Sequence, residues 1–229
     1  MAPELLSLLP VALLGAVLGL DVVSFPQAMI SRPIVAATVA GAFIGNASAG
    51  LVMGAVLELL ALEMLPFGAS RYPEWGSASV VGGALFAVQQ GSPAGALAAS
   101  LFAALVTAML SGRSMVWLRR LNASLATREH DALESGSGKA VTSLQLFGLT
   151  ADLVRGFTVT FVAMLIFSPL IRSIVASWGT DSRYSRAIVV AIVAAVSAGA
   201  IWKIFHLVPR ARLLFIAGLA IGAYVLVSA

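Results

Sequence analysis

Apolar segments recur along this chain at lengths suited to crossing or entering a lipid bilayer. The clearest are Leu5–Leu20, Ile34–Ile44, Leu51–Leu65, Leu144–Ile171, Ala187–Trp202 and Leu213–Val227. A spanning helix needs about 20 mostly apolar residues, because the hydrocarbon core is about 30 Å thick. The chain has 229 residues, which leaves room for roughly six to eight membrane-entering helices. We therefore expect one integral-membrane domain over residues 1–229.

The composition excludes several other classes of protein. Hydrophobic residues make up 60% of the chain and charged residues only 10%, against about 25% charged in ordinary soluble domains. A soluble fold of this size cannot bury that much apolar surface. A soluble enzyme, a nucleic-acid binder and a disordered chain are therefore excluded. The predicted fold class is an all-α, polytopic helical membrane protein.

The N-terminal half contains a predicted broken hairpin. Pro33 can open a helix, and the apolar run Ile34–Ile44 reaches only about halfway across a bilayer. It breaks at the small, polar stretch 45–50, and a second apolar run follows. We expect a re-entrant hairpin, whose turn must be buried in protein or line a wet cavity. A similar arm and turn near Gly91–Ala94 is either a tandem repeat or a chance likeness.

The polar segment of about 112–143 is predicted to be a cytoplasmic loop. It carries Arg113, Arg119, Arg120, Arg128 and Lys139, and an excess of Lys and Arg marks cytoplasmic loops. The apolar residues of 115–125 follow helical spacing, which predicts an amphipathic helix on the membrane surface. The acidic start of the chain has no positive leader region. We therefore expect Leu5–Leu20 to be an uncleaved first helix.

Charged residues inside apolar segments are the candidate functional residues, since each costs roughly 2.5–3.5 kcal/mol at the bilayer centre. Glu58 lies within an unbroken apolar run and is the first candidate. Its carboxylate can accept hydrogen bonds from sugar hydroxyls, pair with an arginine, or clamp two helices together. Glu63 follows on another face and either contacts the ligand or pairs with Arg71 or Arg32.

Two flanking polar stretches add further candidates. Gln27 and Arg32 precede the hairpin, and an amide both donates and accepts hydrogen bonds. The stretch 71–76 offers Arg71 and Glu74 for hydroxyls, and its Tyr72 and Trp75 for stacking on a sugar face or for an interfacial aromatic belt. The predicted substrate-binding residues are thus Glu58, then Gln27, Arg32, Glu63, Arg71 and Glu74.

Other motifs are absent or have a simpler explanation. Asp152 and Arg155 are three residues apart on one predicted helix and are expected to pair with each other. The chain has no cysteine and two distant histidines. Neither a metal site nor a phosphate-binding glycine loop is predicted, so no cofactor is expected.

The segment of roughly 20–80 resembles a known family. It contains Arg32-Pro33, a glycine turn at Gly45-Asn46, a Leu57-Glu58 step followed by Ala61-Leu62, then Gly68-Ala69 and Pro73-Glu74. This order is similar to the IIC subunit of the mannose/fructose/sorbose-type sugar phosphotransferase system. The chain departs from mannose-type members at Glu63-Met64-Leu65-Pro66, where they tend to carry Gly-Trp-x-Asn.

The resemblance implies a permease of a bacterial inner membrane that binds and translocates a sugar. Its implied partners are a IID membrane subunit and cytoplasmic IIA and IIB subunits that carry the phosphate, in a higher-order oligomer. In such a complex this subunit is itself non-catalytic. Two alternatives stay open: a substrate-capture subunit of another transporter class, powered by a separate ATPase, and a regulatory or scaffolding protein that keeps the fold without coupled transport.

Overall fold

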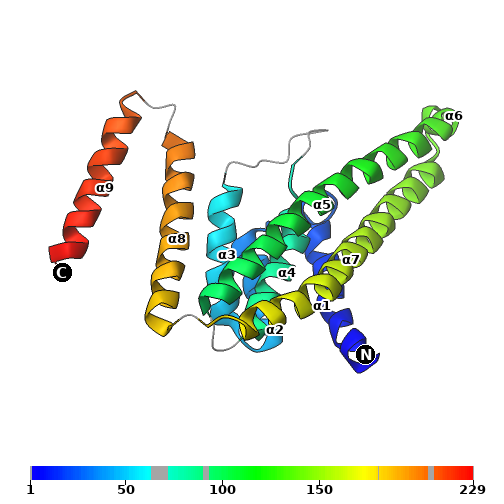
Figure 1. Ribbon diagram of the computed structural model, residues 1–229. Coiled ribbons are helices and arrows are strands. Elements are labelled where there is room, and N and C mark those ends of the chain that lie inside the picture. The colour runs from blue at the N-terminus through cyan, green and yellow to red at the C-terminus, as the bar shows by residue number, and fades with distance from the viewer. Residues whose placement is uncertain (1, 63–71, 90–92, 180, 206–208, 229) are drawn as a thin grey trace.

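The computed structural model describes residues 2–62, 72–89, 93–179, 181–205 and 209–228, which form helices joined by turns and irregular segments, without a strand. The helices are shown in Figure 1. In chain order they are α1 (Ala2–Leu20), α2 (Pro33–Ile44), α3 (Ala47–Ala61), α4 (Trp75–Val88), α5 (Pro93–Arg128), α6 (His130–Glu134), α7 (Gly138–Ala176), α8 (Ser182–Phe205) and α9 (Ala211–Ser228). The predicted all-α fold class is confirmed.

Three of the described helices are long and apolar enough to cross a membrane by length and composition. They cover Ala94–Arg128, Gly138–Ala176 and Arg183–Lys203. The other apolar helices are shorter, as in α2 with 12 residues and α3 with 15. Long spanning helices and short paired ones therefore occur together, as predicted for a membrane protein with broken hairpins.

The α2–α3 hairpin forms where the sequence predicts it. Pro33 opens α2, and Gly45 ends it with φ of 95°, a left-handed conformation that favours glycine. Asn46 then caps α3, because its side-chain oxygen accepts a hydrogen bond from the Ala49 amide at 3.2 Å. A Cβ on Gly41 would lie 2.6 Å from the Gly50 Cα. The two helices therefore touch through backbone, which requires small residues.

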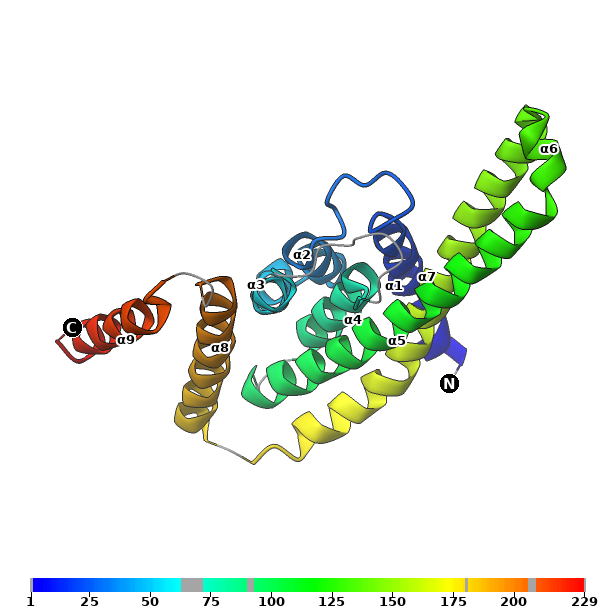
Figure 2. The same ribbon diagram turned by 90° about the horizontal axis from the view of Figure 1, so that it is seen from above.

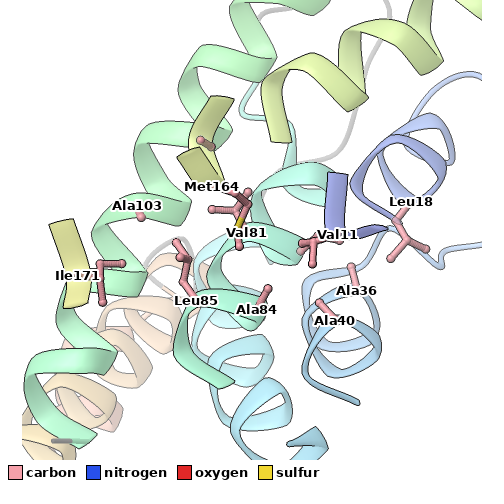
Figure 3. Close-up of a cluster of buried hydrophobic side chains, with 12 residues drawn as sticks. Val11, Leu18, Ala36, Ala40, Val81, Ala84, Leu85, Ala103, Met164 and Ile171 are labelled. Carbon is pink, nitrogen blue, oxygen red and sulfur yellow. The ribbon is translucent and has the colours of Figure 1, made fainter. Parts of the chain in front are cut away.

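Helix α4 forms the centre of the bundle. Almost all of its residues are buried, and α1, α2, α3, α5 and α7 pack around it. Figure 3 shows Val81 and Leu85 between side chains of α1, α2, α5 and α7, with Met164 and Ile171 on the α7 side. A helix that is apolar on all sides belongs in a core. The hairpin and the long helices are thus held by a common centre.

The polar segment 112–143 is mostly helical and continues the long helices, while its place on the cytoplasmic side stays a prediction. Helix α5 continues without a break to Arg128, α6 follows, and α7 begins at Gly138. Met115 and Leu118 are buried along α5, so this stretch is part of a long helix and not a separate surface helix. No proline or glycine stands between Arg113 and Arg128, and Arg, Leu and Ala are good helix formers. The charged residues of this segment indicate that the helix leaves an apolar environment. They do not indicate that the helix ends.

Two peripheral features complete the fold. Helices α5 and α7 run side by side beyond the bundle to α6, as both Figure 1 and Figure 2 show. On the opposite side, α8 packs on α3 and α5. Helix α9 meets α8 through Trp202 and Phe215, whose ring centroids are 5.7 Å apart.

Candidate functional site

The segment between α1 and α2 is organised by one buried carboxylate. Asp21 accepts hydrogen bonds from the Ala28 amide at 2.6 Å, the Ser31 amide at 2.9 Å and the Ser31 hydroxyl at 2.8 Å. Within this turn Gln27 and Met29 have φ values of 59° and 62°, which non-glycine residues adopt at a cost of about 1–3 kcal/mol. Asp21 thus holds a segment whose backbone has unfavourable conformations.

The surroundings of Asp21 also change its acidity. Burial alone raises the pKa of the carboxyl, but the hydrogen bonds from Ser31 and Ala28 together outweigh this effect. The pKa is therefore below its ordinary value of 3.8. Asp21 is ionised at neutral pH, which makes it a strong acceptor for these amides.

A pocket of about 360 Å³ opens beside this segment, and we call it the loop pocket. Its lining residues are Asp21, Val22, Val23, Gln27, Met29, Ser31, Arg32, Pro33, Ala61 and Trp75. It therefore brings together two of the predicted site residues, Gln27 and Arg32, and adds Trp75. Trp75 is only 9% exposed, and its indole nitrogen has no partner among the described residues.

Glu58 lies next to the loop pocket and orients one of its side chains. Its carboxylate forms an ion pair with Arg32 and also accepts a hydrogen bond from the Ile34 amide at 3.2 Å. That amide is in the first turn of α2, where a negative charge is favourable. Of the alternatives for Glu58, pairing with an arginine is confirmed. Direct contact with a ligand stays a prediction, because Glu58 does not line the pocket.

Glu74 has a different position from the one expected for a ligand residue. It is fully buried and caps α4, accepting a hydrogen bond from the Ser77 amide at 3.0 Å. The Ser111 hydroxyl donates to its other oxygen at 2.6 Å. The structure does not bring Glu74 to the loop pocket. Its carboxylate instead joins α4 to α5.

Ser111 connects Glu74 to the predicted Asp152–Arg155 pair, which is confirmed at 2.8 Å. The Arg155 guanidinium donates to the Ser111 hydroxyl oxygen at 2.7 Å, and the Ser24 hydroxyl donates to Asp152. Glu74, Ser111, Asp152 and Arg155 form what we call the buried polar cluster, which the exposed Ser24 joins from the segment between α1 and α2. It links α4, α5 and α7 to the segment that lines the loop pocket.

The remaining predicted residues are distributed as follows. Glu63 and Arg71 lie outside the described residues. Tyr72 and Trp75 do not share a pocket, because Tyr72 lines a separate one on α5. Sequence reasoning missed Ser24 and Ser111, whose partners are distant in the chain. Asp21 was not among the predicted site residues, and the nearby Ser31 is the sign in the sequence of a turn closed by a carboxylate.

The loop pocket can bind a small, uncharged, hydroxyl-rich ligand. Arg32 supplies hydrogen-bond donors, Gln27 supplies a donor and an acceptor, and Trp75 supplies an aromatic surface. Such a combination of apolar lining and few polar groups is typical of small-molecule sites.

Comparison with known proteins identifies the family of this chain. Residues 5–228 match the family described as the sorbose-specific IIC component of the sugar phosphotransferase system. The chain belongs to this family. The resemblance predicted from the sequence is thereby confirmed, and the family together with the apolar helices indicates a multi-pass membrane protein.

Two curated relatives show how far the likeness extends. The sorbose-specific EIIC component of Klebsiella pneumoniae is 27% identical over 135 residues, which are 59% of this chain and 48% of the relative. The fructose permease IIC component of Bacillus subtilis (strain 168) is 24% identical over 162 residues, which are 70% of this chain and 58% of the relative. The chain thus spans about half the length of the curated relatives it matches.

Proposed function

We propose that this chain binds a sugar in the loop pocket and carries it across the bacterial inner membrane as a permease of the phosphotransferase system. The observation that carries the proposal is that Gln27, Arg32 and Trp75 line one pocket. Family membership supports the sugar as ligand class. Fructose and sorbose, which the names of the two relatives specify, are the first sugars to test.

Within this proposal each residue has a defined task. Arg32 donates hydrogen bonds to sugar hydroxyls, and Gln27 completes them from the turn. Glu58 holds the Arg32 guanidinium in place, and it accepts a sugar hydroxyl where the ion pair opens. Trp75 lies under the apolar face of the ring. Glu63 and Arg71, which lie outside the described residues, are kept as proposed sugar contacts, as is Glu74, which does not line the loop pocket.

The proposed partners supply the chemistry that this chain does not perform. A IID membrane subunit assembles with it into a higher-order oligomer, and IIA and IIB subunits deliver phosphate to the sugar. The whole of 1–229 acts as a single integral domain, with 112–143 on the cytoplasmic side. The short α2–α3 hairpin next to the pocket suits movement of a bound sugar between the two sides, as broken helices do in other transporters.

Titration of the purified chain with D-fructose and L-sorbose tests this proposal. Glu58→Gln removes the charge that orients Arg32, and we expect the affinity for the bound sugar to fall about tenfold or more, as for a lost hydrogen bond to a charged group. Glu134→Gln is the matched control, since Glu134 is exposed in α6 and pairs with His130.

Unchanged sugar affinity in Glu58→Gln, in protein that purifies as well as the wild type, would overturn the assignment of this site. Failure of the wild-type chain to bind any sugar, alone or with its membrane partner, would favour a regulatory protein that keeps the fold.

A further inference from the structure

A second pocket, separate from the loop pocket, lies where the chain before α4 meets α5. The Glu74 amide donates a hydrogen bond to the Ala108 carbonyl at 2.9 Å. A Cβ on Gly112 would lie 2.1 Å from the Tyr72 carbonyl oxygen. This close contact leaves a pocket of about 460 Å³, which we call the arginine pocket, lined by Tyr72, Pro73, Met109, Gly112, Arg113, Val116, Trp117 and Arg120.

The arginine pocket sits at the boundary between the apolar and polar parts of α5. The helix is almost entirely apolar or small up to Leu110, and its first charge is Arg113. Met109 and Trp117, on the two sides of this boundary, are 56% and 71% exposed. Exposed tryptophan beside arginine at the end of an apolar span is typical of the headgroup level of a bilayer.

The pocket has an excess of positive charge. Arg113, Trp117 and Arg120 recur at helical spacing and so lie on one face of α5. Among the described residues, no carboxylate lies within ion-pair distance of Arg113 or Arg120. The Arg120 guanidinium carbon lies 5.8 Å from the Trp117 ring centroid, a cation–π contact that leaves guanidinium N–H groups available.

Tyr72, on the other side of the pocket, is held in place by Arg119. The Arg119 guanidinium lies 4.9 Å from the Tyr72 ring centroid and donates a hydrogen bond to the Tyr72 hydroxyl. Burial raises the pKa of this hydroxyl above its ordinary value even though Arg119 opposes the shift. Tyr72 is therefore neutral at physiological pH, and the pocket keeps its full positive charge.

We propose that the arginine pocket binds the phosphate of an anionic lipid headgroup. Guanidinium groups match phosphate oxygens in pairs, and Arg113 and Arg120 bring two such groups to one pocket. Met109 and Val116 offer apolar surface for the first part of the acyl chains. A lipid supplies both a phosphate and an apolar chain at this depth, whereas a free phosphate ester leaves the exposed Met109 uncovered.

Native mass spectrometry of the detergent-purified chain tests the lipid site. Phosphatidylglycerol is titrated against phosphatidylcholine, whose headgroup has no net charge. We expect phosphatidylglycerol to bind more tightly, and its affinity to fall about tenfold or more in the double variant Arg113→Gln/Arg120→Gln. The double variant Arg183→Gln/Arg186→Gln removes the same charge from exposed positions on α8 and should bind like the wild type.

Three outcomes would overturn the proposal. The first is equal binding by the Arg113/Arg120 variant and the wild type, and the second is an equal loss in the α8 control. The third is displacement of the lipid by fructose 1-phosphate or inorganic phosphate at micromolar concentration, which would make this a site for soluble phosphates. If the double variant does not fold, Arg113→Lys/Arg120→Lys keeps the charge but lacks the planar fork. It should keep the preference for phosphatidylglycerol but bind it less tightly, and wild-type affinity in this variant would also overturn the proposal.

Discussion

The loop pocket and the buried polar cluster each contain an arginine paired with a carboxylate in an apolar chain, yet the two pairs differ in exposure. The Arg32 and Glu58 side chains are 37% and 17% exposed, whereas those of Arg155 and Asp152 are 8% and 0% exposed. The difference teaches that a charge within apolar sequence is not by itself a sign of a binding site. A charged side chain marks a binding site only where it is exposed enough to form further hydrogen bonds to a ligand.

In the buried polar cluster both carboxylates are satisfied within the protein, and of the Arg155 guanidinium only Nη2 has no hydrogen-bond partner among the described residues. Asp152 receives hydrogen bonds on both oxygens, from Arg155 and Ser24, and Glu74 likewise from Ser77 and Ser111. At the loop pocket, Arg32 pairs with Glu58 among the described residues, and its partly exposed side chain also lines the pocket. The first arrangement holds helices together, and the second can accept a ligand.

The largest expected effect is a difference in the free energy of unfolding when the arginine of each pair is removed. Arg155→Leu leaves the buried Asp152 carboxylate without its guanidinium, and we expect a loss of about 3–5 kcal/mol in the free energy of unfolding. Arg32→Leu affects a partly exposed pair and should cost about 1 kcal/mol or less. Denaturant unfolding of both variants in detergent measures the difference. Equal losses would mean that the two pairs do not differ as described.

The next effect sharpens the comparison through ligand affinity. Arg32→Lys keeps the charge beside Glu58 but lacks the planar fork of donors. We expect about tenfold weaker binding of the sugar identified by titration, with little change in stability. Arg183→Lys, on α8 and away from the pocket, is the control. Wild-type affinity in Arg32→Lys would show that Arg32 does not touch the sugar.

A third prediction concerns the backbone contact beneath the buried polar cluster. Gly112→Ala places a methyl group against the Tyr72 carbonyl, which pushes residues 72–74 away from α5. We expect a loss of about 1–3 kcal/mol, as for overpacking. Gly199→Ala in α8 meets no atom within 4 Å and should be neutral or stabilising by up to about 1 kcal/mol. Thermal melts of both variants measure this, and a stable Gly112→Ala protein would contradict the tight contact.

The smallest effect is tied to pH. Asp21→Asn replaces a carboxylate acceptor by a neutral amide, which should lower the free energy of unfolding by about 1 kcal/mol near neutral pH. The folded pKa of Asp21 is below 3.8. Its contribution is therefore complete above that pH and is lost as pH falls through the folded value. Unfolding measured at pH 7 and at decreasing acidic pH should show the gap between variant and wild type closing. A gap that does not change with pH would exclude Asp21 as its source.

The sequence predicted those parts of the molecule that depend on local pattern. The α2–α3 hairpin follows from Pro33 and Gly45, and the Asp152–Arg155 pair follows from spacing along one helix. The loop pocket could not be predicted from local pattern, because Trp75 reaches it from α4 only through tertiary packing. The link between Glu74 and Ser111 joins positions 37 apart in sequence, and no periodicity in a single chain reports such a contact.

The continuation of α5 and α7 as helices through the polar segment 112–143 was also not predicted in full, and the reason is physical. Charge density reports whether a segment meets water, whereas helix continuation depends on backbone propensity and on the absence of breakers. Helices α5 and α7 have 36 and 39 residues, or roughly 54 and 58 Å at 1.5 Å per residue. Both therefore exceed a hydrocarbon core of about 30 Å and continue as helices beyond it.

The projecting pair of α5 and α7 acts mechanically as a lever arm. From Arg113 to Arg128 α5 extends about 22 Å, so a rotation of about 10° within the bundle displaces the distal end by about 4 Å by simple geometry on that length. Small rearrangements around α4 are thereby magnified at α6. A spin label or fluorophore on the exposed His130, paired with one in the bundle, would report any rotation of this helix pair where the displacement is greatest.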